Sequence, residues 1–429
     1  MNSTSLLKYD KINNIVRRTD ALKSRIRLLS SLQKIVNLPP DHDITIRQWY
    51  AINEQLKKIE SRLLLKLEQK ERQYKFGLHV PESLQKMNAH LANIELEAVK
   101  AFNFFDTMFD IITQRCVIGR LLAGCEVIAD DAIRIKHPTL RVLESPIVFC
   151  DRGYGASILR QGIKLPYNVK NPVPLIQIPY SRLKTKYDLI SIIHEAGHEI
   201  TNQLKLDHSL VPHIKSNLRN VNADSIVAEL FSVGLSEIIP DLCALLKCGF
   251  AHVSSLRDIL SVPPEYVFTL SRTDPHPTPY IRVLLAFENC RRIWGKGIWD
   301  DLEREWMDTY PLRSTPNNAE LIIKNIIKNL PLLSKTLLET RLDSLNGKRI
   351  PDLFDLSCVS PTIIQQATRS LETGTLNLKG LKPCTQLAVF RIIRDEGRLT
   401  EVNLNKLMTK WLVRLGEMRE RRMPKIIAA

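Results

Sequence analysis

Between Tyr187 and Ile200 the apolar residues recur at the spacing of one helix face. They are Leu189, Ile192, Ile193, Ala196 and Ile200, and this stripe predicts an amphipathic helix packed on a core. His194 and His198 lie four residues apart, so such a helix places them one turn apart on the same face. Two imidazoles at that spacing can reach one metal ion at about 2.0–2.1 Å. The segment therefore predicts a core helix that carries a metal site.

Glu195, which directly follows the first histidine, adds a proton acceptor to this helix. Glu195 lies near the open coordination position, where its carboxylate can take a proton from bound water. The five-residue pattern arises by chance in about one sequence of this length and composition in a hundred, and the alternative interpretation is two surface histidines without a metal. The segment resembles the active-site helix of the HExxH zinc metallopeptidases, the zincins, and this resemblance implies Zn²⁺ as cofactor.

A third ligand distinguishes the branches of the zincins. The metzincin pattern needs Gly at 201 and His at 204, but this chain has Thr201 and Leu204, so that branch is excluded. Gluzincins take a Glu from a later helix, and the resemblance indicates Glu229. It belongs to a polar stripe, Ser225, Glu229, Ser232 and Ser236, on an otherwise apolar helix. A carboxylate buried in such a setting should be paired or metal-bound.

Other third ligands stay open. Asp224 would give an aspzincin-like site, and His208 and His213 are the remaining donors. Many gluzincins also carry an Asp four residues after the ligand Glu, where it supports a metal-bound His. Here that position is Val233, so the supporting role is unassigned.

The segment 274–282 offers groups for the reaction itself. It reads Asp-Pro-His-Pro-Thr-Pro-Tyr-Ile-Arg and resembles a His-Pro stretch followed by Arg that some gluzincins place near the substrate carbonyl. An anionic tetrahedral intermediate needs hydrogen-bond donors, and His276, Tyr280 or Arg282 could provide them. The alternative is a rigid loop that caps the helix beginning near Tyr280.

Two short apolar segments predict a small mixed sheet at about 140–182. The first covers 145–150, and the second covers 174–180 with a proline at each end. Prolines suit an edge strand, because a central strand would lose ladder hydrogen bonds. In zincins such an edge pairs with the peptide substrate. The candidate substrate-binding residues are Leu175, Ile176, Gln177, Ile178 and Tyr180.

The remaining chain reads as helical. Apolar residues at helical spacing over 15–36 and 49–63, with a Pro-containing loop between them, predict an antiparallel hairpin. We therefore expect a predominantly α-helical α+β fold with a helical accessory region (1–138), a zincin-like core (139–300) and a helical C-terminal region with a basic tail (301–429).

The net charge of +15 suggests anionic partners, but the excess lies at the ends of the chain. Residues 1–100 contribute +7 and 401–429 contribute +4, which leaves +4 for the centre. The helical N-terminal region is a candidate surface for a protein partner. Nucleic acid is a less favoured partner, and the basic segment 414–425 is the only argument for a membrane surface.

The chain is expected to be cytoplasmic. Its first residues lack the apolar stretch of a signal peptide, and its eight cysteines include no Cys-x-x-Cys pair. The most apolar long window, 230–253, is broken by Glu237, Asp241 and Lys247, so we expect a buried helix and no transmembrane segment. Cys243 and Cys248 are expected to be core residues.

The sequence thus predicts a zinc metallopeptidase that hydrolyses peptide bonds of a protein or peptide substrate, as a selective intracellular endopeptidase. The rival hypotheses are a zinc-stabilised binding or regulatory protein without proteolysis, and a protease that reaches nucleic-acid-associated proteins through its basic ends.

Overall fold

The computed structural model describes residues 3–39, 42–74, 80–153, 155–165, 169–315 and 319–422. Helices make up 74% of the chain, and a few short strands form small sheets, which confirms the predominantly helical α+β class. Within the described residues, no helix combines the length and the apolar character that crossing a bilayer requires. All eight cysteines are free thiols, and Cys243 and Cys248 are buried as expected.

Contacts divide the chain into two compact units. The first comprises residues 1–123, 159–175 and 420–429, and the second comprises 124–158 and 176–419. The first division therefore falls near residue 123 instead of 138. Residues 301–419 belong to the same unit as the His194–His198 segment.

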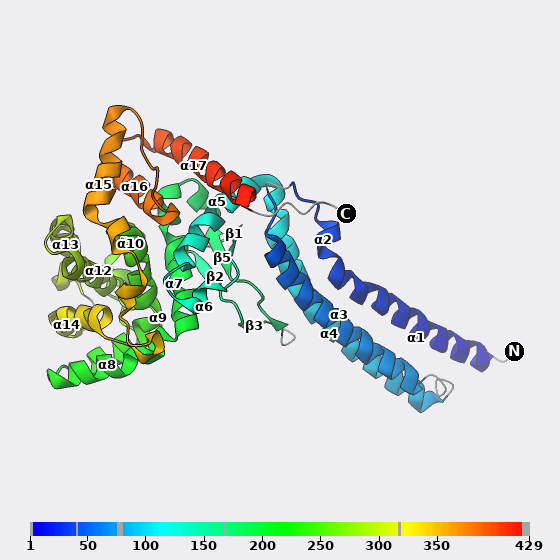
Figure 1. Cartoon of the computed structure of the whole chain (residues 1–429). Helices are drawn as coiled ribbons and strands as arrows, with labels where there is room; N and C mark the ends of the chain where they lie inside the picture. The colour runs from blue at the N-terminus through cyan, green and yellow to red at the C-terminus, as the bar shows by residue number, and fades with distance from the viewer. Residues whose placement is uncertain are drawn as a thin grey trace. The chain divides into compact units, whose positions relative to one another are not determined.

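Three long helices build the first unit (Figure 1). They are α1 (Ser3–Arg27), continued by η1 (Leu28–Ser31) and α2 (Leu32–Ile35), then α3 (Ile46–Tyr74) and α4 (Pro81–Thr113). Lys23 pairs with Glu71 at 2.6 Å, and Ile15 packs with Tyr74, so α1 and α3 run antiparallel as the apolar spacing predicts. A small antiparallel hairpin, β3 (Lys164–Leu165) with β4 (Val169–Lys170), belongs to the same unit.

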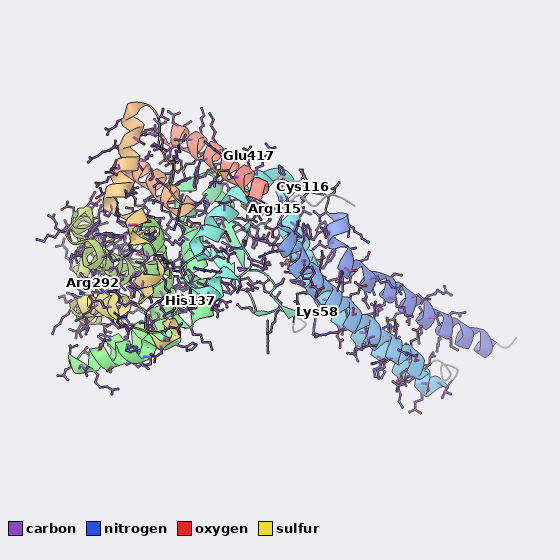
Figure 2. All side chains as sticks on the ribbon, viewed as in Figure 1. Lys58, Arg115, Cys116, His137, Arg292 and Glu417 are labelled. Atoms are coloured by element: carbon purple, nitrogen blue, oxygen red, sulfur yellow. The ribbon has the colours of Figure 1, made fainter. Side chains whose placement is uncertain are left out.

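A buried arginine closes the turn before α3. Arg115, labelled in Figure 2, begins α5 (Arg115–Ile133) and donates to the backbone oxygens of His42 and Asp43. The His42 ring in turn contacts the Arg115 oxygen at 2.7 Å. These bonds satisfy backbone groups that the Pro-containing connection leaves outside any helix.

The three-stranded sheet corrects one prediction. Its order is β1 (Ile147–Asp151), β5 (Leu175–Pro179) and β2 (Ser157–Leu159), so β5 is the central strand. The prolines at 174 and 179 stand before the strand and at its last residue, where no ladder bond inside the strand is lost. The prediction that residues 175–180 form a free edge for substrate is wrong, because both sides of β5 are paired. Gln177 bonds to Arg152 and Ser157, and Tyr180 lies outside the strand in η3 (Tyr180–Leu183).

The rest of the second unit is helical. After α6 (Pro138–Arg141) and the sheet come η4 (Lys186–Leu189), α7 (Ile190–Leu204), α8 (Leu206–Asn220), α9 (Ser225–Cys248), α10 (Ala251–Leu260), α11 (Pro264–Val267), α12 (Pro279–Trp294), α13 (Ile298–Thr309), α14 (Ala319–Glu339), α15 (Pro361–Arg369), α16 (Pro383–Asp395) and α17 (Glu401–Arg422). The expected helix with the two histidines is α7.

Helices α7 and α9 cross at a glycine. A Cβ on Gly197 would lie 2.7 Å from the Cα of Pro240, closer than real Cβ atoms come to backbone. Glycine therefore allows the two backbones to approach at this point. Pro240 lies within α9 and lacks an N–H, so the Ser236 carbonyl loses its normal helical partner one turn earlier. The crossing lies beside His194 and His198.

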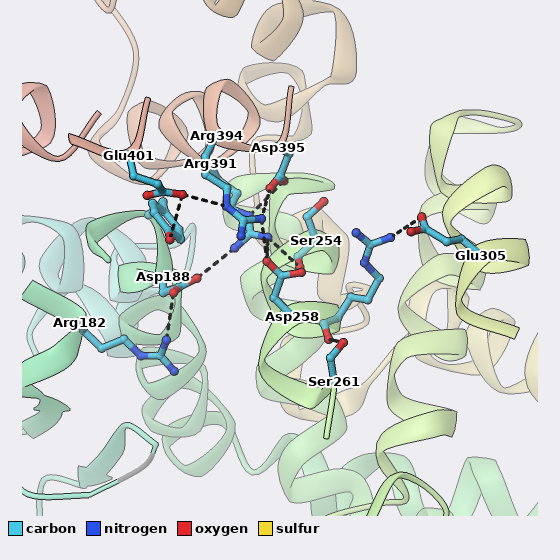
Figure 3. A network of polar contacts seen from close by, with 12 residues as sticks. Arg182, Asp188, Ser254, Asp258, Ser261, Glu305, Arg391, Arg394, Asp395 and Glu401 are labelled. Carbon is cyan, nitrogen blue, oxygen red and sulfur yellow. Dashed lines mark hydrogen bonds and ion pairs between the residues drawn. The ribbon is translucent and has the colours of Figure 1, made fainter. Parts of the chain in front are cut away.

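A buried arginine network fixes the start of α7 (Figure 3). Arg391 of α16 is fully buried and donates to Asp188, directly before α7, at 3.0 Å. It also pairs with Asp258 and with Asp395, and it donates to the Ser254 oxygen at 3.1 Å. Arg182 holds the second Asp188 oxygen at 3.1 Å. Because Asp188 is buried, both of its oxygens need these partners.

Replacement of Arg391 by Met should lower the free energy of unfolding by about 3 kcal/mol, because the buried carboxylate of Asp188 and the partly buried one of Asp258 each lose one of their two arginine partners. Urea unfolding followed by circular dichroism measures this loss. The control is Arg304→Met, which breaks an exposed ion pair with Asp301 and should change stability by less than about 1 kcal/mol. Equal effects of the two substitutions would contradict the anchoring role.

Candidate metal centre

Helix α9 supplies a carboxylate to the histidine pair. A Glu237 oxygen lies 3.4 Å from His194 Nε2, and its other oxygen lies 3.5 Å from His198 Nε2. Ligand atoms about 2.0–2.1 Å from a tetrahedral zinc ion stand about 3.4 Å apart, by the geometry of a tetrahedron. The two separations from Glu237 therefore match the distance between ligands of one such ion. His194, His198 and Glu237 are the residues that could hold it.

Glu195 completes the cluster. One ligand atom each of His194, Glu195 and His198 lies within 4.8 Å of the others, and a Glu195 oxygen is 4.0 Å from His198 Nε2. The Glu195 side chain is almost fully buried, and burial raises its pKa to about 7. A carboxyl group with that pKa can both accept and release a proton near neutral pH.

Behind the histidines lies Asp241, one turn after Glu237. Its carboxylate accepts from His194 Nδ1 at 2.8 Å and from Arg282 at 2.8 and 3.0 Å. The bond to Nδ1 turns the opposite nitrogen, Nε2, toward Glu237. Such a carboxylate behind a histidine orients the ring and makes it a stronger ligand.

The charges of this buried cluster do not balance. Glu195, Glu237 and Asp241 are buried, and Arg282 is the buried guanidinium that contacts the last two, so three negative charges face one positive charge. His252 lies 3.6 Å from Asp241 but stays neutral, because burial lowers its pKa to about 4. With all three carboxylates ionised and His194 neutral, the surplus of two negative charges equals the charge of one divalent cation.

Protonation is the other way to balance the charges. Burial lowers the pKa of His194, but Asp241 and Glu237 outweigh burial and raise that pKa to about 10. Glu237 is held below its ordinary pKa by His194 despite burial. A proton on His194 Nε2 and a metal ion require the same lone pair, so they compete for it.

His276 faces the cluster from the loop before α12. Its Nε2 lies 3.7 Å from a Glu237 oxygen, and its Nδ1 contacts Asp274 at 2.7 Å. Asp274 also accepts from the His276 backbone N–H, which fixes the turn. A Cβ on Gly234 would lie 2.5 Å from Pro277 Cγ, so glycine lets the loop rest directly on α9. The loop thus presents an oriented imidazole, 61% exposed, to the site.

The other two expected donors have different surroundings. Tyr280 is buried against Phe268 and Trp306, and in the part of the chain described here its hydroxyl has no hydrogen-bond partner. Burial raises its pKa to about 12, so it stays neutral. Arg282 is occupied by Asp241, 3.6 Å from Glu237. It therefore holds the carboxylates in place, and only His276 of the three presents an exposed donor toward the cluster.

Glu229 is not beside the histidines. It is exposed on α9, eight residues before Glu237, which corresponds to about 12 Å along the helix axis. The structure therefore replaces Glu229 with Glu237 as candidate third ligand. Asp224 caps α9 by accepting from the Ile226 N–H, and the alternatives His208 and His213 are exposed on α8. Within the described residues, only His194, Glu195 and His198 form a cluster of at least three such side chains that could hold a metal ion.

A sequence signal for Glu237 was present. The Asp expected four residues after the ligand Glu is absent after Glu229, but Asp241 follows Glu237 at that spacing. Both carboxylates interrupt an otherwise apolar run, where a charged group needs a specific partner. The spacing and the apolar setting together identify the pair.

Comparison of the chain with protein-family models, with characterised proteins and with solved structures gives no match. The chemistry of the centre therefore rests on its own geometry.

Glu237→Ala should remove bound zinc, whereas Glu229→Ala should leave it, because only Glu237 lies at ligand distance from both histidines. We expect about one zinc per wild-type chain and a more than 100-fold weaker affinity in Glu237→Ala. Dialysis followed by elemental analysis measures the metal content. Zinc loss in Glu229→Ala with retention in Glu237→Ala would restore the sequence-based assignment.

Metal binding should release protons, with a number that depends on pH. At pH 8, His194 still carries its proton and Glu195 does not, so at least one proton leaves. At pH 6, Glu195 is also protonated and the count rises toward two. Titration calorimetry with zinc in buffers of different ionisation enthalpy gives this number. A count of zero at pH 8 would contradict the interpretation.

Proposed function

We propose that the chain is a zinc-dependent peptidase that hydrolyses peptide bonds of protein or peptide substrates. The observation that carries the proposal is the pair of 3.4 and 3.5 Å separations between Glu237 and the two histidine Nε2 atoms. The surplus of two buried negative charges supports a divalent cation, and the gluzincin-like order of ligands supports zinc.

Zinc bound by His194, His198 and Glu237 would supply a Lewis acid for the scissile carbonyl and lower the pKa of a water molecule. Glu195 accepts the proton of the attacking water at a carboxylate oxygen and passes it to the leaving amine. Its pKa near 7 suits both transfers.

His276 acts on the negative charge that develops on the carbonyl oxygen. Asp274 contacts Nδ1, so the ring turns its other nitrogen, Nε2, toward the site. Donation from Nε2 to the oxyanion stabilises the transition state. Asp241 and Arg282 keep His194 and Glu237 in place throughout.

A purely structural zinc site accounts less well for the same residues. Structural sites are closed by four protein ligands, whereas this cluster has three ligands and a fourth residue, Glu195, suited to proton transfer. The basic ends do not favour nucleic acid over a protein partner, and a partner for the N-terminal helices stays a prediction.

The test is Glu195→Gln, which keeps size and polarity but cannot accept a proton. We expect zinc content equal to that of the wild type and a fall in kcat of about 10²–10⁴-fold on a peptide library or casein. Glu229→Gln, an exposed carboxamide substitution on α9, is the matched control and should keep full activity. Undiminished hydrolysis by Glu195→Gln would overturn the assigned role.

A further inference from the structure

His252 is a buried histidine to which the proposed mechanism gives no role. It stands on α10 with 3% of its surface exposed, and neither ring nitrogen has a hydrogen-bond partner within the described residues. A buried polar group without a partner lowers the stability of the folded chain. An apolar side chain at this position would avoid that loss, so the imidazole has a reason other than packing.

The turn between α9 and α10 places His252 beside the candidate metal centre. Helix α9 ends at Cys248, and Gly249, with a φ of 65°, follows in a conformation that suits glycine. His252 comes three residues later, and its Nε2 lies 3.6 Å from Asp241 Oδ1. The same oxygen accepts from His194 Nδ1 at 2.8 Å. His252 therefore faces the carboxylate that supports a candidate ligand.

Asp241 has capacity for one more donor. A carboxylate accepts about four hydrogen bonds. In the part of the chain that the structure describes, Asp241 accepts three, one from His194 and two from Arg282. The 3.6 Å separation from His252 is about 0.4 Å longer than the longest N–H···O bonds. A donor without a partner thus stands next to an acceptor with a free position, just beyond bonding distance.

The His252 ring offers a donor without a charge. Burial lowers its pKa to about 4, so the imidazole is neutral near neutral pH and has a single N–H. The nearby Asp241 carboxylate favours the tautomer with that proton on Nε2. Such a donor can hold Asp241 without adding a positive charge next to a site for a cation.

A hydrogen bond that is not made in one state of a protein can favour another state in which it is made. The state that forms the bond is stabilised relative to the one that leaves the donor unpaired. Partners behind a metal-bound histidine change metal affinity about 10–100-fold. Asp241 is such a partner of His194, so a further donor to Asp241 acts on the affinity for the metal.

We propose that His252 is a positioning residue of the metal centre and that its N–H bonds to Asp241 in the zinc-loaded protein. The bond keeps the Asp241 carboxylate against His194. The inference rests on the proposed zinc-dependent function, and it assigns His252 no contact with substrate or metal and no proton transfer.

The first test is His252→Phe, which keeps an aromatic ring and removes the donor. In the metal-free protein the substitution removes an unpaired polar group, so Tm should rise by at least about 2 °C. The Kd for zinc, measured by competition with a chromophoric chelator, should also rise, at least about 10-fold. A residue that only fills space would lose stability and zinc affinity together, so a lower Tm of the metal-free variant would contradict the proposal.

The second test restores the donor. The side-chain amide of His252→Gln places an N–H near the position of Nε2, so its Kd for zinc should return to within about threefold of the wild type. His213→Phe, on the exposed surface of α8, is the control and should change neither Tm nor Kd. Equal zinc affinity of the wild type and His252→Phe would overturn the inference, and so would equal affinity of the Phe and Gln variants.

Peptide hydrolysis by the same samples separates this inference from the peptidase proposal. If the wild type binds zinc and hydrolyses nothing, but the affinities follow the expected order, the peptidase proposal fails and the role of His252 stands. If the wild type hydrolyses casein and all variants bind zinc equally, the role of His252 fails and the peptidase proposal stands.

Discussion

The close crossing of α7 and α9 is the constraint on which the candidate site depends. Gly197 has no side chain where Pro240 approaches, and this brings two histidines of one helix within reach of a carboxylate of the other. Any larger residue at 197 would separate the helices by more than the ligand distances tolerate. The same crossing places Asp241 behind His194, so ligand and supporting residue come from consecutive turns of α9.

Burial then sets the chemistry of the cluster. A low-dielectric site with three carboxylates and one guanidinium cannot keep all its charges without further positive charge. The shortfall appears as raised pKa values of His194 and Glu195. His194 and Glu195 thus hold the compensating protons. A bound cation would displace the proton of His194, and Glu195 would pass its proton to a leaving group. Arg282 pairs with Asp241 through two hydrogen bonds and so keeps that carboxylate ionised.

Local patterns predicted part of this structure and long-range packing decided the rest. The helical stripe around His194 and the apolar spacing of the N-terminal helices predicted α7, α1 and α3, because periodicity reports which face a helix buries. It does not report which helix lies opposite, so it points to the polar stripe around Glu229 and gives no weight to Glu237. Glu237 and Asp241 were read only as interruptions of an apolar run, although two carboxylates one turn apart in such a run need a partner. The prolines beside β5 misled because strand order depends on distant segments that no local pattern encodes.

The anchor of α7 has a consequence for how the protein is made. Arg391 lies 203 residues after Asp188, the residue that it holds at the start of the helix with the two histidines. A ribosome adds roughly 5–20 residues per second, so about 10–40 s separate the synthesis of these partners. During that interval the helix has its histidines but not its buried anchor. The candidate metal centre of a new chain is thus completed only after most of the chain has been synthesised.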